Sequence, residues 1–219
     1  MNRFFLVIIM MLLPFVPNKQ AFANDLSGNI GISLYGGVNL PTNGNISSEV
    51  KTTDFLKVGP QFGLGVSYYF TEGFGVEAIG SYGYNFYKDD YKIIGKEPVL
   101  SNLSVSLDAV YDFGHLFGNS IISPFARAGV GIYNWSHFED GLGSDFIKIN
   151  NEENKATSFG FNVGIGVDFI APCDSNFRVG LLVDYNMYFP KDEAKFGKDF
   201  AEQGTLTPQI RVSYYIPTK

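Results

Sequence analysis

Apolar and small polar residues alternate along residues 58–86. Phe62, Leu64, Val66 and Tyr68 share one parity, and the other parity is mostly glycine and serine. A period of two indicates a β-strand with two unlike faces. The second face carries no fringe of long lysine or glutamate side chains, unlike an ordinary solvated surface. The pattern therefore indicates a fold with an apolar outer surface and an interior lined by small, polar residues.

The same alternation returns along the whole chain. It predicts about eight strands of roughly ten residues, the length that crosses a bilayer when the strand is tilted. The predicted strands are 30–40, two within 58–86, 103–113, 124–135, 159–169, 178–189 and 209–216.

The connections between these strands alternate in length. The short ones are 71–73, 114–120 and 171–176, and the long polar ones are 42–59, 88–98, 136–157 and 190–204. A soluble sandwich has no reason to collect long loops at one end, whereas an outer-membrane barrel does. The predicted fold is all-β: an eight-stranded antiparallel up-and-down transmembrane β-barrel with short periplasmic turns and long extracellular loops.

Aromatic residues gather near both ends of the predicted strands. Such rings favour the headgroup level of a bilayer, so we interpret them as two girdles. The alternative, an aromatic sandwich core, does not explain rings at both rims. Near the short turns lie Tyr68, Phe70, Phe74, Tyr111, Phe113, Phe169 and Tyr214, and near the long loops lie Tyr82, Tyr84, Phe86, Trp135, Phe159, Tyr185 and Phe189.

Several charged residues fall on the inward parity. A barrel of eight strands is filled by its own side chains, so buried charges there must pair. We expect Arg127, Arg178 and Arg211 at the centre of a lumen salt-bridge network. Its function is either that of a structural plug, which we favour, or that of a gate or proton path. The predicted members are Glu77, Asp108, Arg127, Asp168, Arg178, Asp184 and Arg211.

The N-terminus and the composition restrict location and partners. Arg3, an apolar run over 4–16 and the small residues of Ala21-Phe22-Ala23 predict a cleaved secretory signal peptide over 1–23, followed by one barrel domain over 24–219. Without Arg3 and Lys19 the mature chain has 14 Lys+Arg against 22 Asp+Glu, which excludes a nucleic-acid binder. Cys173 is the single cysteine, so no disulfide or cysteine-based metal site is expected within the chain.

The segments "PFARAGVGIYN", "FGVEAIGSYGYN", "NVGIGVDF" and "RVGLLVDYN" resemble the small outer-membrane β-barrel proteins of the OmpA/OmpX type. The resemblance covers residues 29–216 and implies the outer membrane of a Gram-negative bacterium. It also implies outer-membrane lipid and lipopolysaccharide as surroundings. We expect a monomer without a cofactor that is not an enzyme. Its role is structural, or rests on contact with a surface or host protein through the four long loops.

Two alternatives remain open. Tyr35, Tyr87, Tyr133 and Tyr188 either line a conduit for small hydrophobic molecules or close the lumen. A lipid A-modifying enzyme needs a serine next to a histidine base, and "NWSHFED" offers Ser136 and His137. Neighbours on an extended strand point to opposite faces, which argues against that pair.

The third long loop is acidic. It either binds divalent cations beside lipopolysaccharide, binds a protein partner, or is only solvated, since no calcium-loop spacing appears. Its charged residues are Glu139, Asp140, Asp145, Glu152 and Glu153 against Lys148 and Lys155.

Overall fold

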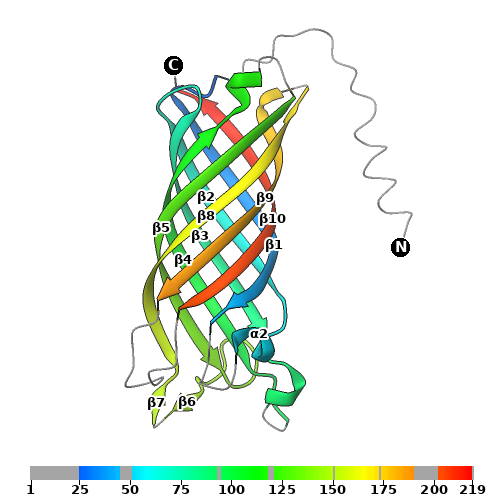
Figure 1. Ribbon diagram of the computed structural model, residues 1–219, viewed down its shortest axis with the longest axis vertical. Coiled ribbons are helices and arrows are strands. Elements are labelled where there is room, and N and C mark those ends of the chain that lie inside the picture. The colour runs from blue at the N-terminus through cyan, green and yellow to red at the C-terminus, as the bar shows by residue number, and fades with distance from the viewer. Residues whose placement is uncertain are drawn as a thin grey trace, which may run out of the picture.

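The computed structural model describes residues 25–44, 51–92, 95–117, 121–149, 151–172, 174–189 and 202–218. Eight strands form a closed barrel in which each strand is antiparallel to both neighbours, and the last pairs with the first (Figure 1). The predicted architecture is confirmed. The strands are β1 (Asn29–Asn43), β2 (Gly59–Tyr69), β3 (Phe74–Phe86), β4 (Val99–Asp112), β5 (Ile122–Phe138), β8 (Lys155–Ala171), β9 (Asp174–Phe189) and β10 (Gln203–Pro217).

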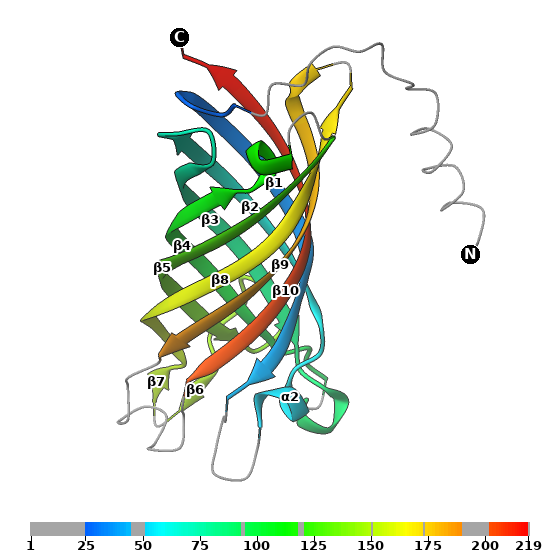
Figure 2. The same ribbon diagram turned by 45° about the horizontal axis from the view of Figure 1, so that its top comes forward.

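Short elements decorate the two ends of the barrel. The long-loop end carries the helix α2, the 3-10 turn η1 and the small hairpin β6–β7, of which Figure 2 labels α2, β6 and β7. A second 3-10 turn, η2, follows β4 at the short-turn end. No helix in the described segments is long and apolar enough to cross a membrane. The bounds are α2 (Thr52–Phe55), η1 (Asp89–Tyr91), η2 (Gly114–Phe117), β6 (Lys148–Ile149) and β7 (Glu152–Glu153).

The strands are longer than the sequence pattern indicates. They have 11 to 17 residues instead of about ten. In particular, β5 and β8 stay paired as far as Ser136 and Lys155, so the predicted loop 136–157 is too long at both ends. Backbone hydrogen bonding continues here beyond the point where side chains stop alternating, and side-chain periodicity does not report it.

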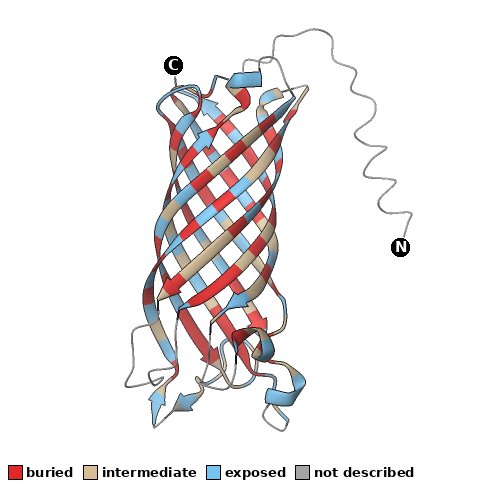
Figure 3. Cartoon of the chain, viewed as in Figure 1, coloured by how far each residue is buried: buried red, intermediate tan, exposed pale blue. Residues whose placement is uncertain are grey.

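Burial alternates along each strand, as Figure 3 shows by colour. Large apolar side chains point outward, with exposed fractions of 59% for Leu34, 61% for Val105 and 70% for Ile165. The small and charged parity points into the lumen and is buried. The unusual prediction of an apolar outside and a polar inside is confirmed.

The two aromatic girdles are mostly exposed rings, as predicted, but Trp135 is an exception. Its side chain is only 1% exposed, and its Nε1 donates a hydrogen bond to Ser158 Oγ at 3.1 Å. Trp135 has the same parity as Tyr133, so it faces the lumen. The girdle assignment of Trp135 is therefore wrong. Its inward position gives its ring an apolar environment and its N–H a buried acceptor, which an indole requires.

Apolar clusters lie inside both ends of the barrel. The cluster at the short-turn end contains Leu26, Tyr35, Tyr69, Ile79, Val110, Phe125, Leu182 and Tyr215. The cluster at the loop end contains Leu56, Tyr87, Leu100, Tyr133, Trp135 and Tyr188. Charged side chains lie among the members of the first cluster, with Arg178 over Tyr215 and Arg211 over Phe125, and polar side chains fill the lumen from there toward the second cluster. The predicted signal peptide, Cys173 and most of the predicted loop 190–204 lie outside the described residues.

Candidate functional site

Three lumen aspartates lie opposite glycines on neighbouring strands. The register pairs Asp108 with Gly129, Gly164 with Asp184, and Asp168 with Gly180. A Cβ on any of these glycines would overlap the Oδ1 of its aspartate partner. Because each glycine has no side chain, the carboxylate of the aspartate opposite can lie over the glycine. This explains why glycine recurs on the inward parity beside the acidic residues.

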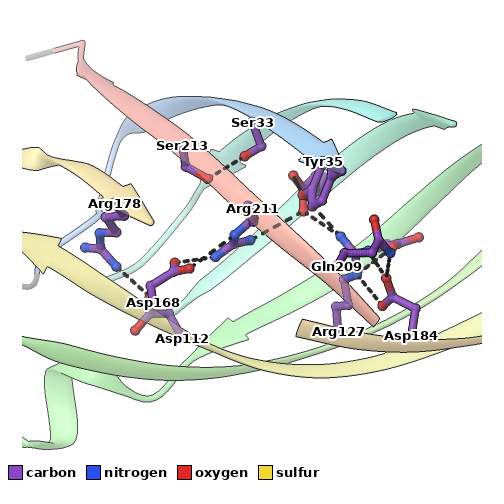
Figure 4. Close-up of polar contacts among 12 residues, drawn as sticks. Ser33, Tyr35, Asp112, Arg127, Asp168, Arg178, Asp184, Gln209, Arg211 and Ser213 are labelled. Carbon is purple, nitrogen blue, oxygen red and sulfur yellow. Dashed lines mark hydrogen bonds and ion pairs between the residues drawn. The ribbon is translucent and has the colours of Figure 1, made fainter. Parts of the chain in front are cut away.

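Arg127 on β5 belongs to the polar network in Figure 4, where it lies beside Asp184 and Gln209. Its guanidinium donates two hydrogen bonds to Asp184, with Nε 2.9 Å from Oδ1 and Nη2 bonded to Oδ2. Nη1 donates to Tyr35 Oη at 3.2 Å and lies 3.5 Å from Glu77 Oε2. Asp184 also accepts a hydrogen bond from Gln209 Nε2 at 2.6 Å. This two-point Arg127–Asp184 pair has the planar geometry that suits a guanidinium.

Arg211 on β10 forms the next pair. It donates from Nε to Asp168 Oδ1 at 3.3 Å and from Nη2 to Asp168 Oδ2. Its Nη1 lies 4.0 Å from Glu77 Oε2, so Glu77 links Arg211 with Arg127. Both Arg211 and Asp168 are buried. The two guanidiniums thereby share one glutamate across the lumen.

Arg178 forms a third pair, with a partner outside the predicted set. Its Nη1 donates to Asp112 Oδ2 at 2.9 Å, and the same carboxylate accepts hydrogen bonds from Ser123 Oγ and the Gly114 backbone N–H. The expectation that Arg178 lies among Glu77, Asp108, Asp168 and Asp184 is therefore wrong. The inward parity of Asp112 could have identified it, but its place at a strand end concealed its role.

An aromatic ring accompanies each of the three guanidiniums. Arg127 lies over Tyr35 at 5.1 Å, Arg178 over Tyr215 at 4.9 Å and Arg211 over Phe125 at 3.9 Å, measured from Cζ to the ring centroid. Cation–π contacts of this kind strengthen when water is excluded. Each arginine is thus held by a carboxylate in its plane and a ring on its face.

A neutral polar layer lies between Arg127 and the loop end. Its hydrogen bonds join Ser81 to Ser104 at 2.7 Å, Gln61 to Ser81 at 3.3 Å and Tyr133 to Asn186 at 3.3 Å. Two cavities remain in this region, with volumes of about 20 and 10 Å³. Such volumes hold about one water molecule each. In the described segments the lumen is therefore filled by side chains at this level.

The four tyrosines that were expected near the outer rim occupy two levels. Tyr87, Tyr133 and Tyr188 belong to the cluster at the loop end, where the rings of Tyr133 and Tyr188 stack with centroids 5.3 Å apart. Tyr35 lies deeper, where its hydroxyl donates to Glu77. All four side chains are buried, and Tyr35 and Tyr133 line the small polar cavity beside Arg127.

Ser136 and His137 do not form a nucleophile–base pair. The His137 ring is buried, hydrogen-bonds Tyr87 through Nδ1 and packs against Trp135. No hydrogen bond joins Ser136 to His137 in the described part of the chain. In that part there is also no group of three or more His, Cys, Asp or Glu side chains that is arranged to hold a metal ion.

The loops before β2 and β4 pack against each other. Lys88 Nζ donates to the Thr53 carbonyl at 2.7 Å, and Phe55 contacts the ring of Tyr87 with centroids 4.1 Å apart. Hydrogen bonds from Lys57 and Lys92 lower the pKa of the exposed Asp89 below its ordinary value. Exposed pairs of this kind add little stability. The backbone and ring contacts therefore hold these two loops together.

The acidic loop joins the same assembly. Glu139 pairs with Lys96, the Gly141 N–H donates to the Glu97 carbonyl at 2.9 Å, and the Glu97 N–H donates to Asp140 Oδ1 at 3.1 Å. Three of the four long connections thus form one continuous surface at the loop end, within the residues that the structure describes.

The family model for the outer membrane protein beta-barrel domain matches residues 6–214. The chain therefore belongs to this family of outer-membrane barrels, and the resemblance inferred from sequence is confirmed. No curated protein matches the chain.

Solved structures share the fold at low identity. Neisserial surface protein A is 16% identical, with a TM-score of 0.55 over 86% of this chain and 97% of that one. The outer membrane protein OprG from Pseudomonas aeruginosa is 15% identical, with a TM-score of 0.50 over 90% of this chain and 99% of that one. These likenesses concern the fold alone.

Proposed function

We propose that this protein is a plugged outer-membrane barrel that serves a structural or surface-interaction role through its extracellular loops. The main support is the packing of the lumen: among the described residues, three arginine–carboxylate pairs and two apolar clusters lie there, and the two cavities in its polar layer have volumes of about 20 and 10 Å³. A solute larger than water has no room there. The seven predicted lumen residues, together with Asp112, act as a structural plug in this proposal.

The plug is tested by conductance. We expect the folded barrel to show no steady channels in planar lipid bilayers, because ion passage would need several buried pairs to separate. The shift between folded and heat-unfolded bands on a gel confirms that the inserted protein is folded. Steady channels of nanosiemens size would contradict the plug and return a gate or conduit to consideration.

The same proposal extends to location and processing. The family supports the outer membrane of a Gram-negative bacterium, and residues 1–23 act as a signal peptide that is cleaved on export. The barrel domain then covers 24–219. In this proposal the protein is a monomer, and lipid and lipopolysaccharide surround the barrel. His137 Nδ1 is hydrogen-bonded to the Tyr87 hydroxyl and not to Ser136. This contact supports the proposal that the protein is not an enzyme.

The docked loops are the proposed working surface. Three long connections form one surface through contacts such as Lys96–Glu139 and Lys88–Thr53. Ordered loops lose less conformational entropy on binding a partner than free loops do. A surface or host protein is therefore the proposed partner, with the acidic loop after β5 as the main contact.

A shortened loop tests this surface. Residues 138–153 are replaced by Asn-Gly, which connects His137 and Asn154, joined by a backbone hydrogen bond, through a two-residue hairpin turn. We expect crosslinking pull-down from intact cells to lose the partners captured by the wild type, while the gel shift shows an intact barrel. The double variant Asp140→Asn, Asp145→Asn keeps the loop length and removes two negative charges. It therefore shows whether capture depends on the charge of the loop or on its shape. Capture that is unchanged in both variants would contradict the assignment.

A further inference from the structure

The lumen contains more carboxylates than guanidiniums. Among the described residues, five buried carboxylates face three buried guanidiniums. An ionised carboxylate without a compensating charge is expensive to bury. The excess must therefore be neutralised locally. The acidic residues are Glu77, Asp108, Asp112, Asp168 and Asp184, and the basic ones are Arg127, Arg178 and Arg211.

Four of the five carboxylates have strong donors. Asp112, Asp168 and Asp184 each accept at least one direct hydrogen bond from a guanidinium of their own. Glu77 accepts the Tyr35 hydroxyl and lies 3.5 Å from Arg127 Nη1, with Arg211 Nη1 4.0 Å away on its other side. Each of these four groups thus has a direct donor from a guanidinium or a hydroxyl.

Asp108 has weaker compensation. The nearest guanidinium atom is Arg127 Nε, 3.7 Å from its Oδ2, and that N–H already points to Asp184 at 2.9 Å. Asn162 Nδ2 donates to Oδ2 at 2.7 Å, which is a neutral contact. Oδ1 is buried and has no hydrogen-bond partner within the described residues, and the whole residue is 0% exposed.

The register adds a like charge beside Asp108. Glu77 on β3 and Asp108 on β4 are direct cross-strand partners, and both side chains point into the lumen. Like charges at directly opposed positions destabilise a sheet, and two carboxylates at one site do not both ionise readily. The charged groups that face Asp108 are thus Glu77 from β3 and Arg127 from β5, with Asp184 of β9 as the other partner of Arg127.

The neutralising cation must be very small. Asp108 does not line either of the two lumen cavities, whose volumes are about 20 and 10 Å³. A proton is the one cation that needs no further space at Asp108 Oδ1. We propose that Asp108 is a proton-binding site, so that its side chain stays a neutral carboxylic acid at neutral pH. This inference rests on the filled lumen of the proposed function.

A proton on Asp108 has two consequences. A neutral Asp108 does not compete for the Arg127 guanidinium. Arg127 therefore pairs with Asp184 and Glu77, and the network has a single preferred pairing. The proton also links stability to pH, because the folded barrel holds it while the unfolded chain, with an ordinary aspartate near pH 4, releases it. The folded state then binds more protons than the unfolded state, and lowering the pH from about 8 to 5 favours folding.

Infrared spectroscopy of the detergent-folded barrel tests the site directly. At neutral pH we expect the C=O stretching band of a protonated carboxylic acid in the wild type, with a shift in D2O, and no such band in Asp108→Asn. A wild-type spectrum without the band overturns the proposal. A band that persists in Asp108→Asn also overturns it, since the proton would then lie on another group.

Unfolding provides the second measurement. At pH 7, Asp108→Asn should raise the urea midpoint, because the amide is neutral in both states, whereas the unfolded wild type is stabilised by releasing the Asp108 proton. Asp184→Asn should lower the midpoint strongly, because Arg127 loses its two-point partner. Each unit of pH lowered from 7 to 5 should raise the folding equilibrium constant of the wild type about tenfold more than that of Asp108→Asn.

Equal damage from Asp108→Asn and Asp184→Asn, or equal pH slopes in wild type and Asp108→Asn, would overturn the site. The proposal of a plugged lumen and the proposal of a protonated Asp108 can be refuted independently. A silent barrel without a carboxylic acid band refutes only the proton, whereas a conducting barrel refutes the filled lumen.

Discussion

Replacing Arg127 by alanine should lower the free energy of unfolding by about 3 to 5 kcal/mol, the usual cost of removing one member of a buried ion pair. The change strands Asp184, which loses both of its hydrogen bonds from the guanidinium. It also removes the nearest guanidinium from Glu77 and the cation over the Tyr35 ring.

Val130→Ala is the matched control on the same strand. Val130 lies three residues further along β5, on the opposite parity, and its side chain is half exposed to the membrane side. The lost methyl groups should cost on the order of 1 kcal/mol or less. The readout is the urea or heat midpoint in detergent, followed by the gel shift of the folded barrel. Equal or greater damage from Val130→Ala would contradict the assignment of the two faces.

Gly164→Ala should destabilise the barrel by about 2 to 4 kcal/mol, a typical cost of overpacking combined with a weakened ion pair. The added Cβ would overlap Asp184 Oδ1 and lie 3.3 Å from Arg127 Cγ. The carboxylate can move only by giving up its geometry with Arg127. A single methyl group should therefore disturb the network almost as much as the loss of a charge.

Gly80→Ala is the control for this change. Gly80 is also in a strand of the barrel, β3, but it is exposed on the outer face, and a Cβ there would meet no atom within 4 Å. We expect its effect to stay within about 0.5 kcal/mol, as for surface substitutions in general. If both alanines shift the urea midpoint equally, intrinsic strand preference and not the fit around Asp184 explains the inward glycines.

The direction of each side chain was predictable because it is a local property. Leu34, Val105 and Ile165 point outward and Arg127 points inward, as their parity predicts. The same parity placed all seven charged residues in the lumen. The error at Trp135 came from its place near a strand end and not from alternation: its ring was assigned to the outer girdle, although its parity, shared with Tyr133, points inward, where the ring is buried.

The pairing of the lumen charges was not predictable in the same way. Arg178 faces Asp112, and Tyr35 lies beside Arg127 and Glu77 instead of at the outer rim. These contacts join strands that are far apart in sequence, and their heights depend on strand tilt and stagger around the closed barrel. A one-dimensional pattern contains neither quantity.

The sequence by itself determined that this chain is a barrel with an apolar outside, a charged inside and long loops at one end, because each of these follows from period and spacing. Only the tertiary structure decided which charge meets which, because closure sets the heights of distant strands. It placed Asp108 directly beside Glu77, with Arg127 Nε 3.7 Å away and turned to Asp184. The number of lumen charges could be counted from the sequence, but the carboxylate left without a full partner could not be identified.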